Sequence, residues 1–318
     1  MERYKNNPII KRENIPEIKS YIKDPSSVFN PGATKYNDII KLMLRIQNRA
    51  RETFFVMANS EDGINFSVEN KIVEFKGIEE VKEKIYHCYD ARITRIDNFY
   101  YIMFAMDMEE GCKLGLAQTE DFEQFEFMGI VSENDVRNGV LFPEKINGKY
   151  MRLERPNKFQ VEGGPKTGTQ VFLSESDDLL HWNYIAPVFA GRFHYWDELI
   201  GSGPPPIKTR HGWLHIYHGI ALHYQPIYQA GVILLDLNDP SKVIARGKCN
   251  ILEPRELYET VGQVPNVIFP SGMIVKEYDS DNFAKDESEV YIYYGAADTS
   301  VGLAISSIKE LIYLCYNY

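Results

Sequence analysis

The chain has few cysteines, few strong helix signals and no long apolar run. Its four cysteines are far apart and form no CxxC pair. That pattern argues against structural zinc and favours free thiols in a reducing compartment. No apolar run approaches the length of a bilayer span, and the first ten residues lack the apolar core of a signal peptide. These absences predict a cytoplasmic protein without a membrane-spanning segment.

The chain also lacks an excess of positive charge, because its formal net charge is −10. Without a basic stripe it cannot displace the counterions of duplex nucleic acid, and a membrane surface is disfavoured for the same reason. The GxGxxG, P-loop, HExxH and GxSxG motifs are missing, so the sequence supports no nucleotide-binding, zincin or serine-hydrolase class. Neither a metal nor a cofactor is predicted, since no ligand cluster has suitable spacing.

Aromatic residues are abundant, with 21 Tyr and 17 Phe, and they favour strands over helices. Five aromatic-rich, strand-like segments recur, at 42–46 (LMLRI), 99–105 (FYYIMFA), 149–156 (KYMRLERP), 213–219 (WLHIYHG) and 290–295 (VYIYYG). Five similar β-units predict an all-β protein, a five-bladed β-propeller. Because each blade packs mainly against its neighbours, residues 1–318 are expected to form one domain.

A second repeat has the same period. A hydroxyl residue and an acid, followed by an aromatic, occur at 60–66, 119–125 and 176–182, about sixty residues apart. Such side chains close turns by bonding back to the backbone, so each copy predicts a turn whose aromatic anchors the next strand. Short helices are expected at 78–85 and 306–314. Residues 1–28 resemble an extended lead-in, with a strand that would close the ring by pairing in the last blade.

Residues able to do chemistry lie beside several of these segments. Asp90 precedes the second segment, where it would point toward the propeller axis as a general acid held by Tyr89 and Arg92. Alternatively, Asp90 caps a turn and pairs with Arg92. Arg137 and Arg155 could clamp a phosphate with their planar forks of donors, or form surface salt bridges.

The last two segments carry further candidates. Strand alternation places His218 at the end of an apolar, inward row, where it is either a donor to an anion or a core histidine. Small residues followed by Asp298 suit the floor of a pocket, with Asp298 bonding to sugar hydroxyls. Phe269 and Tyr228 could stack on the apolar face of a sugar or belong to the core.

Taken together, nine ordered segments resemble glycoside hydrolase family 130, the β-mannoside phosphorylases and related β-mannosidases. They are FNPGA at 29–33, YDAR at 89–92, RNGVLFP at 137–143, LERP at 153–156, GPPPI at 203–207, GWLHIYHG at 212–219, LLDL at 234–237, YETVGQVPNV at 258–267 and YYGAADT at 293–299. The ordered set covers nearly the whole chain. The family fold is a five-bladed β-propeller, in agreement with the count of β-units.

The resemblance implies inverting phosphorolysis of a terminal β-mannoside to α-mannose 1-phosphate. The substrate would be a β-1,4- or β-1,2-linked mannooligosaccharide, or mannose linked to glucose or GlcNAc, with inorganic phosphate as co-substrate. Asp90 matches the family's general acid, whose proton passes through a sugar hydroxyl. The phosphate-binding residues are then Arg137, Arg155 and His218, with Tyr228 beside them. The substrate-binding residues are expected to be Asn30, Arg45, Tyr89, Arg92 and Asp298.

This chemistry agrees with first principles. An inverting glycosidase needs one carboxylate as acid and another as base to activate water. Phosphate is already an anionic nucleophile, so it needs no base, but it does need positive charge to hold it at the far face of the sugar. One Asp with a cluster of Arg and His meets that requirement.

One position departs from the family pattern. Many phosphorylases of this family have Lys or Arg just before the Ile-Gly of the fourth blade, where this chain has Leu199. Phosphate affinity would then be weaker, or Lys208 or Arg192 would substitute. Two alternatives therefore stay open: a β-mannoside hydrolase on the same fold and a non-catalytic sugar-binding propeller. The sequence determines neither the linkage and acceptor nor whether the protein is a homo-oligomer.

Overall fold

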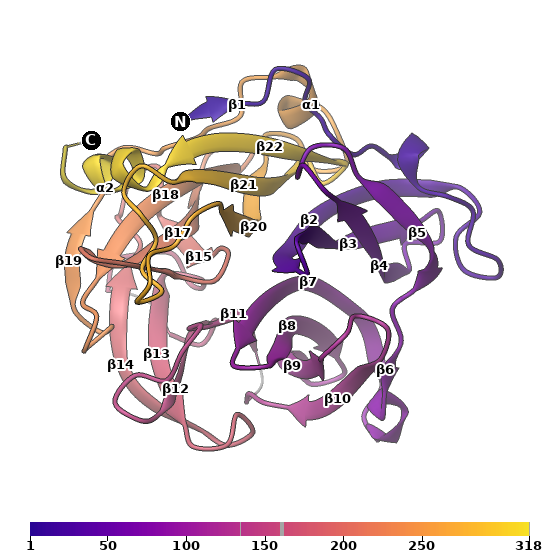
Figure 1. Cartoon of the computed structure of the whole chain (residues 1–318), viewed down its shortest axis with the longest axis horizontal. Coiled ribbons are helices and arrows are strands. Elements are labelled where there is room, and N and C mark those ends of the chain that lie inside the picture. Colours follow the sequence, from indigo (N-terminus) through magenta and orange to yellow (C-terminus); the bar gives the residue numbers. More distant parts are fainter. Residues whose placement is uncertain (134, 160–161, 318) are drawn as a thin grey trace.

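The computed structural model describes residues 1–133, 135–159 and 162–317, which fold into a five-bladed β-propeller (Figure 1). The first blade consists of β2 (Pro25–Tyr36), β3 (Ile39–Asn48), β4 (Thr53–Ser60) and β5 (Ser67–Ile72). The second consists of β7 (Ile85–Ile96), β8 (Phe99–Met108), β9 (Gly111–Thr119) and β10 (Phe125–Ile130), with β6 (Phe75–Lys76) beside β10. The third consists of β11 (Val136–Leu141), β12 (Tyr150–Pro156), β13 (Gln170–Ser176) and β14 (Trp182–Ala190).

The fourth blade consists of β15 (Leu199–Ser202), β16 (Ile207–Thr209), β17 (Gly212–Ala221), β18 (Ile227–Leu235) and β19 (Val243–Arg246). The fifth consists of β20 (Ile268–Val275), β21 (Glu289–Ala296), β22 (Ser300–Ser307) and β1 (Glu2–Arg3). The first strands of the blades, including β2, β7, β11, β15 and β20, contact one another around the axis. They are therefore the innermost strands, and the prediction of a five-bladed propeller is confirmed.

The five aromatic-rich segments all lie in the second strand of a blade, namely β3, β8, β12, β17 and β21. A second strand has a neighbour on both sides and a packed blade on both faces, so it reads as a nearly continuous apolar run. In β17 every residue from Gly212 to Ala221 is buried. This double burial is why the sequence signal was strongest at these strands.

The N-terminal strand closes the ring, as expected. β1 pairs with β22, so that both termini lie at the fifth blade (Figure 1). Arg3 Nε lies 2.8 Å from Oε1 of Glu259, whose side chain is fully buried. Four isoleucines of the lead-in pack into the core between the first and fifth blades: Ile10, Ile15, Ile18 and Ile22. The lead-in is thus part of the domain's core.

The repeated turns have the predicted hydrogen bonds. Ser60 Oγ donates to Asp62 Oδ1, and the same carboxylate oxygen accepts the backbone N–H groups of Ile64 and Asn65, each at 2.8 Å. Asp121 and Asp178 close the corresponding turns between the third and fourth strands of the next two blades. Backbone donors stabilise the carboxylate form, so the pKa of Asp62 lies well below its ordinary value.

The helix prediction at 306–314 is confirmed, and the short helical turn expected within 78–85 is confirmed only for its first three residues. α2 (Ile308–Asn317) buries Ile308 and Leu311 while Tyr313 is exposed. Residues 78–85 contain only a 3₁₀ turn, Ile78–Glu80, after Gly77 at φ 94°. β7 begins at Ile85, because pairing with β8 outweighs a weak local helix preference. α1 (Leu257–Thr260) has four residues. In the described part of the chain, no helix combines the length and apolarity that crossing a bilayer requires.

Candidate active site

A bulge recurs at the same place in the innermost strand of the first three blades. In β2 two residues beginning with Asn30 oppose one residue of β3, and the same holds from Asp90 in β7 and from Asn138 in β11. These three residues have φ of 44°, 57° and 53°. Asn and Asp tolerate this left-handed conformation better than most residues, and a bulge redirects its side chain. The blades therefore present three polar side chains toward the axis.

The bulges face a pocket of about 430 Å³ that all five blades line. Its lining residues are Asn30, Arg45, Gln47, Arg51, Thr53, His87, Tyr89, Asp90, Ala105, Asp107, Arg137, Asn138, Arg155, His218, Ile220, Tyr228, Val264, Val267, Phe269 and Asp298. Every predicted site residue except Arg92 is among them. The fold thus brings together side chains that are more than 250 residues apart in sequence.

Asp90 is buried, with 7% of its surface exposed, and two side chains orient its carboxylate. Nδ2 of Asn30 and Nη1 of Arg45 each donate to Oδ1 at 2.9 Å. Among the described residues, no side chain donates to Oδ2. One oxygen is therefore held by the protein while the other is left for a ligand, as a general acid requires.

Asp298 provides another carboxyl group in the same pocket. Burial raises its pKa to about 6, against the lowering effect of Arg45 and with a smaller raising effect from Asp90. Burial has the largest effect on this pKa because an enclosed carboxylate loses hydration. Asp298 lies in the tight turn between β21 and β22, at φ 49°. Both carboxyl groups thus interact with Arg45.

Positive charge gathers in the third and fourth blades. Arg137 and Arg155 are paired residues of β11 and β12. Burial, together with the nearby Arg137, lowers the pKa of Arg155 to about 10. The pKa of His218 is well below its ordinary value, first because of burial and then because of Arg155. Arg137 thus disfavours the positive charge of Arg155, and Arg155 disfavours a proton on His218, so an anion beside these side chains would relieve that repulsion.

The same cluster contains polar atoms that lack partners. Nε of Arg137, Nε of Arg155 and Nδ1 of His218 are buried without a hydrogen bond. Arg137 has one carboxylate nearby, with Nη2 at 3.9 Å from Asp107 Oδ1. Arg155 reaches only a carbonyl, that of Ile200 at 3.2 Å, and forms no ion pair within the described residues. Unsatisfied buried donors are rare in native proteins, so the cluster has the composition of an anion site.

Aromatic rings support the charged side chains. The ring of His218 lies 4.5 Å from that of Phe269 and 6.1 Å from that of Tyr228, between centroids. The Arg45 guanidinium lies 4.6 Å from the centre of the Tyr89 ring. Tyr89 in turn donates its hydroxyl to Asp107 Oδ1 at 2.7 Å. Tyr89 therefore holds residues that flank the pocket on both sides.

Arg92 does not reach the pocket, so its predicted role in substrate binding is not supported by its position. The side chain is fully buried behind the bulge of β7, where its guanidinium donates to the carbonyls of Asp90 (2.5 Å), Ser202 (3.1 Å) and Gly203 (3.2 Å). It contacts the Asp90 backbone rather than the carboxylate. The Gly-Pro run between β15 and β16 leaves the Gly203 carbonyl free to accept this bond. Arg92 thus ties the second blade to the fourth.

Leu199 stands where many relatives have a basic residue, and neither Lys208 nor Arg192 is placed to contact phosphate in its stead. Lys208 Nζ lies 2.6 Å from Glu144 Oε1 and lines a different cavity. Arg192 Nη2 lies 2.8 Å from Oδ2 of the fully buried Asp197. Both side chains therefore form ion pairs outside the pocket. The cluster of Arg137, Arg155 and His218 gains no further basic residue from them.

Six polar lining residues were not among the sequence candidates: Gln47, Arg51, Thr53, His87, Asp107 and Asn138. Asn138 lies within a segment that resembles the family, and Asp107 follows the second aromatic segment, so both had a local signal. Arg51 had none, because it stands in an ordinary polar turn. Only its position above the pocket distinguishes it.

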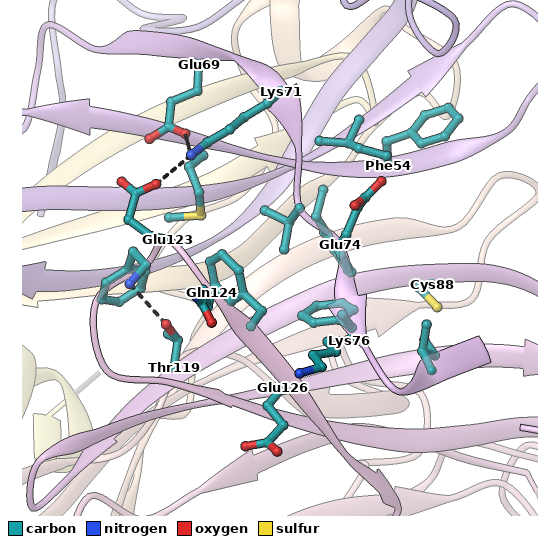
Figure 2. Close-up of a pocket in the computed structure, with 18 of the residues that line it drawn as sticks. Phe54, Glu69, Lys71, Glu74, Lys76, Cys88, Thr119, Glu123, Gln124 and Glu126 are labelled. Atoms are coloured by element: carbon teal, nitrogen blue, oxygen red, sulfur yellow. Dashed lines mark hydrogen bonds and ion pairs between the residues drawn. The ribbon is translucent and has the colours of Figure 1, made fainter. Parts of the chain in front are cut away.

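A larger groove of about 1390 Å³ lies between the outer strands of the first two blades (Figure 2). Its charged side chains engage one another: Lys71 Nζ lies 2.8 Å from Glu123 Oε2 and 3.6 Å from Glu69 Oε2. The smaller pocket is the better candidate for the active site, because unpaired donors from several blades converge there.

Comparisons with known proteins show which proteins the whole chain resembles. The family model of β-1,4-mannooligosaccharide phosphorylase matches residues 1–317. A 1,2-β-oligomannan phosphorylase from Thermoanaerobacter sp. (strain X514) is 35% identical, covering 90% of this chain and 92% of its own. A β-1,4-mannooligosaccharide phosphorylase from Ruminococcus albus is 30% identical, covering 98% and 89%. The structure of β-1,2-mannobiose phosphorylase from Listeria innocua with β-1,2-mannobiose superimposes with a TM-score of 0.85, at 28% identity and 99% and 98% coverage.

Proposed function

The chain belongs to glycoside hydrolase family 130, and we propose that it cleaves terminal β-mannosides with inorganic phosphate. The reaction inverts the anomeric centre and releases α-mannose 1-phosphate and a shortened acceptor. The observation that carries this proposal is the cluster of Arg137, Arg155 and His218. Each has one buried nitrogen without a hydrogen-bond partner, and the cluster shares one pocket with the oriented carboxyl group of Asp90.

The proposed steps use only side chains of this pocket. Phosphate binds between Arg137, Arg155 and His218, which direct one of its oxygens at C1 of the mannose. The bond from phosphate oxygen to C1 forms as the bond from C1 to the acceptor oxygen breaks. Asp90 gives up its proton, which passes through a sugar hydroxyl to that acceptor oxygen. The carboxylate that remains is stabilised by the donors on its Oδ1 from Asn30 and Arg45.

The positive charge of the pocket favours phosphate over water as nucleophile. An inverting hydrolase needs a carboxylate base to activate water, whereas phosphate is already anionic. Arg137 and Arg155 line the pocket with Asp90 and each keeps a buried Nε without a partner, which suits an anionic nucleophile.

We also propose that phosphate is the only co-substrate and that no metal or cofactor takes part, because the two arginines supply the positive charge and His218 offers a ring nitrogen for a hydrogen bond. We further propose a cytoplasmic location, which the state of the cysteines supports. Cys88, Cys112, Cys249 and Cys315 are free, as is usual for proteins of a reducing compartment.

A product assay tests the proposal. The protein is incubated with β-1,2-mannobiose and β-1,4-mannobiose, with and without phosphate, and products are followed by phosphorus and proton NMR. We expect α-mannose 1-phosphate from at least one linkage, only when phosphate is present. Release of free mannose regardless of phosphate would instead identify a hydrolase. Binding of both disaccharides without turnover would identify a sugar-binding propeller.

A further inference from the structure

The rim of the pocket has two unlike walls. Side chains from the first and second blades form a polar wall, consisting of Gln47, Arg51, Thr53 and His87. Side chains from the fourth and fifth blades form an apolar wall, consisting of Ile220, Val264 and Val267. The proposed mechanism uses neither wall. A sugar ring has hydroxyl edges and an apolar face, so this pair of walls matches a second sugar unit beyond the mannose.

Arg51 is the charged residue of the polar wall. Its side chain forms no ion pair within the described residues, although it lines the pocket. The neighbouring Arg49 differs, because its Nη1 lies 3.3 Å from Asp24 Oδ2 and it does not line the pocket. The turn that carries Arg51 is braced by Asn48, whose Oδ1 accepts the backbone N–H groups of Ala50 (2.9 Å) and Glu52 (3.1 Å). The backbone under Arg51 is therefore fixed.

His87 adds a second unused group to this wall. Its Nδ1 is buried and has no hydrogen-bond partner. A buried ring nitrogen without a partner carries a desolvation cost that a ligand hydroxyl would remove. This atom is a second observation, independent of Arg51, that points to a ligand at the polar wall.

The arrangement of the five blades indicates which part of the substrate contacts the polar wall. The phosphate cluster belongs to the third and fourth blades, since Arg155 is in β12 and His218 in β17. In a ring of five blades, the first blade stands opposite the boundary between the third and the fourth. An inverting displacement requires the leaving group opposite the nucleophile. The acceptor sugar must therefore leave toward the first blade, where Gln47 and Arg51 lie.

We propose that Arg51 and Gln47, with His87 beside them, bind the acceptor sugar and select which acceptor the enzyme takes. This inference rests on the proposed phosphorolysis. The Arg51 guanidinium has parallel N–H groups that match two adjacent sugar hydroxyls. The apolar face of the acceptor then packs against Val264, which also lines the pocket. Acceptors without an adjacent pair of hydroxyls on that edge are poor substrates.

The reverse reaction tests this role separately from phosphate binding. Wild type, Arg51→Ala and Arg49→Ala are assayed for disaccharide formation from α-mannose 1-phosphate with D-mannose or D-glucose as acceptor. For Arg51→Ala we expect the KM of the acceptor to rise about tenfold, the loss typical of a charge-assisted hydrogen bond. The KM of α-mannose 1-phosphate should change less than about twofold, and Arg49→Ala should match wild type.

Two results would overturn the inference. One is an acceptor KM in Arg51→Ala equal to that of wild type. The other is an equal loss for both substrates, which would place Arg51 at the phosphate or the mannose. A binding measurement tests the same role without turnover. In an Asp90→Asn background, Arg51→Ala should weaken β-mannobiose binding about tenfold and leave mannose binding unchanged. If that holds while wild type forms no mannose 1-phosphate, the proposed function fails and the sugar site survives.

Discussion

Asn30 and Asp90 occupy the same position of two neighbouring blades, and the side-chain amide of Asn30 donates to Oδ1 of Asp90 at 2.9 Å. Each is the first residue of a bulge in an innermost strand, with positive φ. The acid is thus oriented by an irregularity of the repeated strand rather than by a mobile loop. A site built on strands holds its geometry better than one built on loops.

Asp90→Asn should abolish most of the activity and leave the fold intact. We expect kcat for phosphorolysis to fall about 10²- to 10⁴-fold, the usual contribution of a general acid. Asn has nearly the same shape and tolerates the left-handed conformation, so the melting temperature should change by only a few degrees.

Asp97→Asn is the matched control, because Asp97 is an exposed residue of the same strand pair with φ 55°. It should keep wild-type kcat. Wild-type kcat in Asp90→Asn would remove the acid from the proposed mechanism.

Leu199→Lys should strengthen phosphate binding. Leu199 pairs with Ile220 across β15 and β17, and paired residues share one face of a sheet. Ile220 and His218 both line the pocket, so a lysine at 199 would extend toward the phosphate cluster. We expect the KM of phosphate to fall several-fold while the KM of the mannoside changes little.

Leu199→Met, which adds length without charge, is the control and should resemble wild type. An unchanged or higher KM of phosphate in Leu199→Lys would show that residue 199 is not directed at the anion.

Asp298→Asn should change how stability depends on pH. The pKa of Asp298 is raised to about 6 in the folded protein, from an ordinary 3.8. Between these values the folded state binds more protons than the unfolded state, so wild type loses stability as pH rises through this window. Asn cannot ionise and avoids the loss. We therefore expect the variant to gain about 2 kcal/mol relative to wild type between pH 4 and pH 8, since one pKa unit corresponds to about 1.4 kcal/mol and solvent weakens the effect.

Urea unfolding of both proteins at pH 4, 6 and 8 measures this difference, and other carboxyl groups cancel because they are common to both. Parallel curves for the two proteins would show that burial does not raise the pKa of Asp298.

Local sequence patterns were sufficient to predict the five blades. The aromatic runs at 42–46 and 213–219 are second strands, and such strands can be recognised from sequence because most of their positions are apolar. The Ser60 and Asp62 turn was readable because its hydrogen bonds span only a few residues. The segment at 78–85 forms only a short helical turn. Its helix preference is weak, and pairing with a more distant strand takes over at Ile85.

The sequence by itself determined the repeat, the fold class and most of the chemical groups of the site, because strand periodicity and turn bonding are local. Tertiary structure alone decided which groups meet. Arg92 lies in a family-like segment, yet carbonyls from the fourth blade draw it behind the pocket. Arg51 lies in an unremarkable turn, yet ring closure places it above Asp90's pocket. These outcomes depend on contacts between distant strands, whose register and bulges arise only when all five blades pack around one axis.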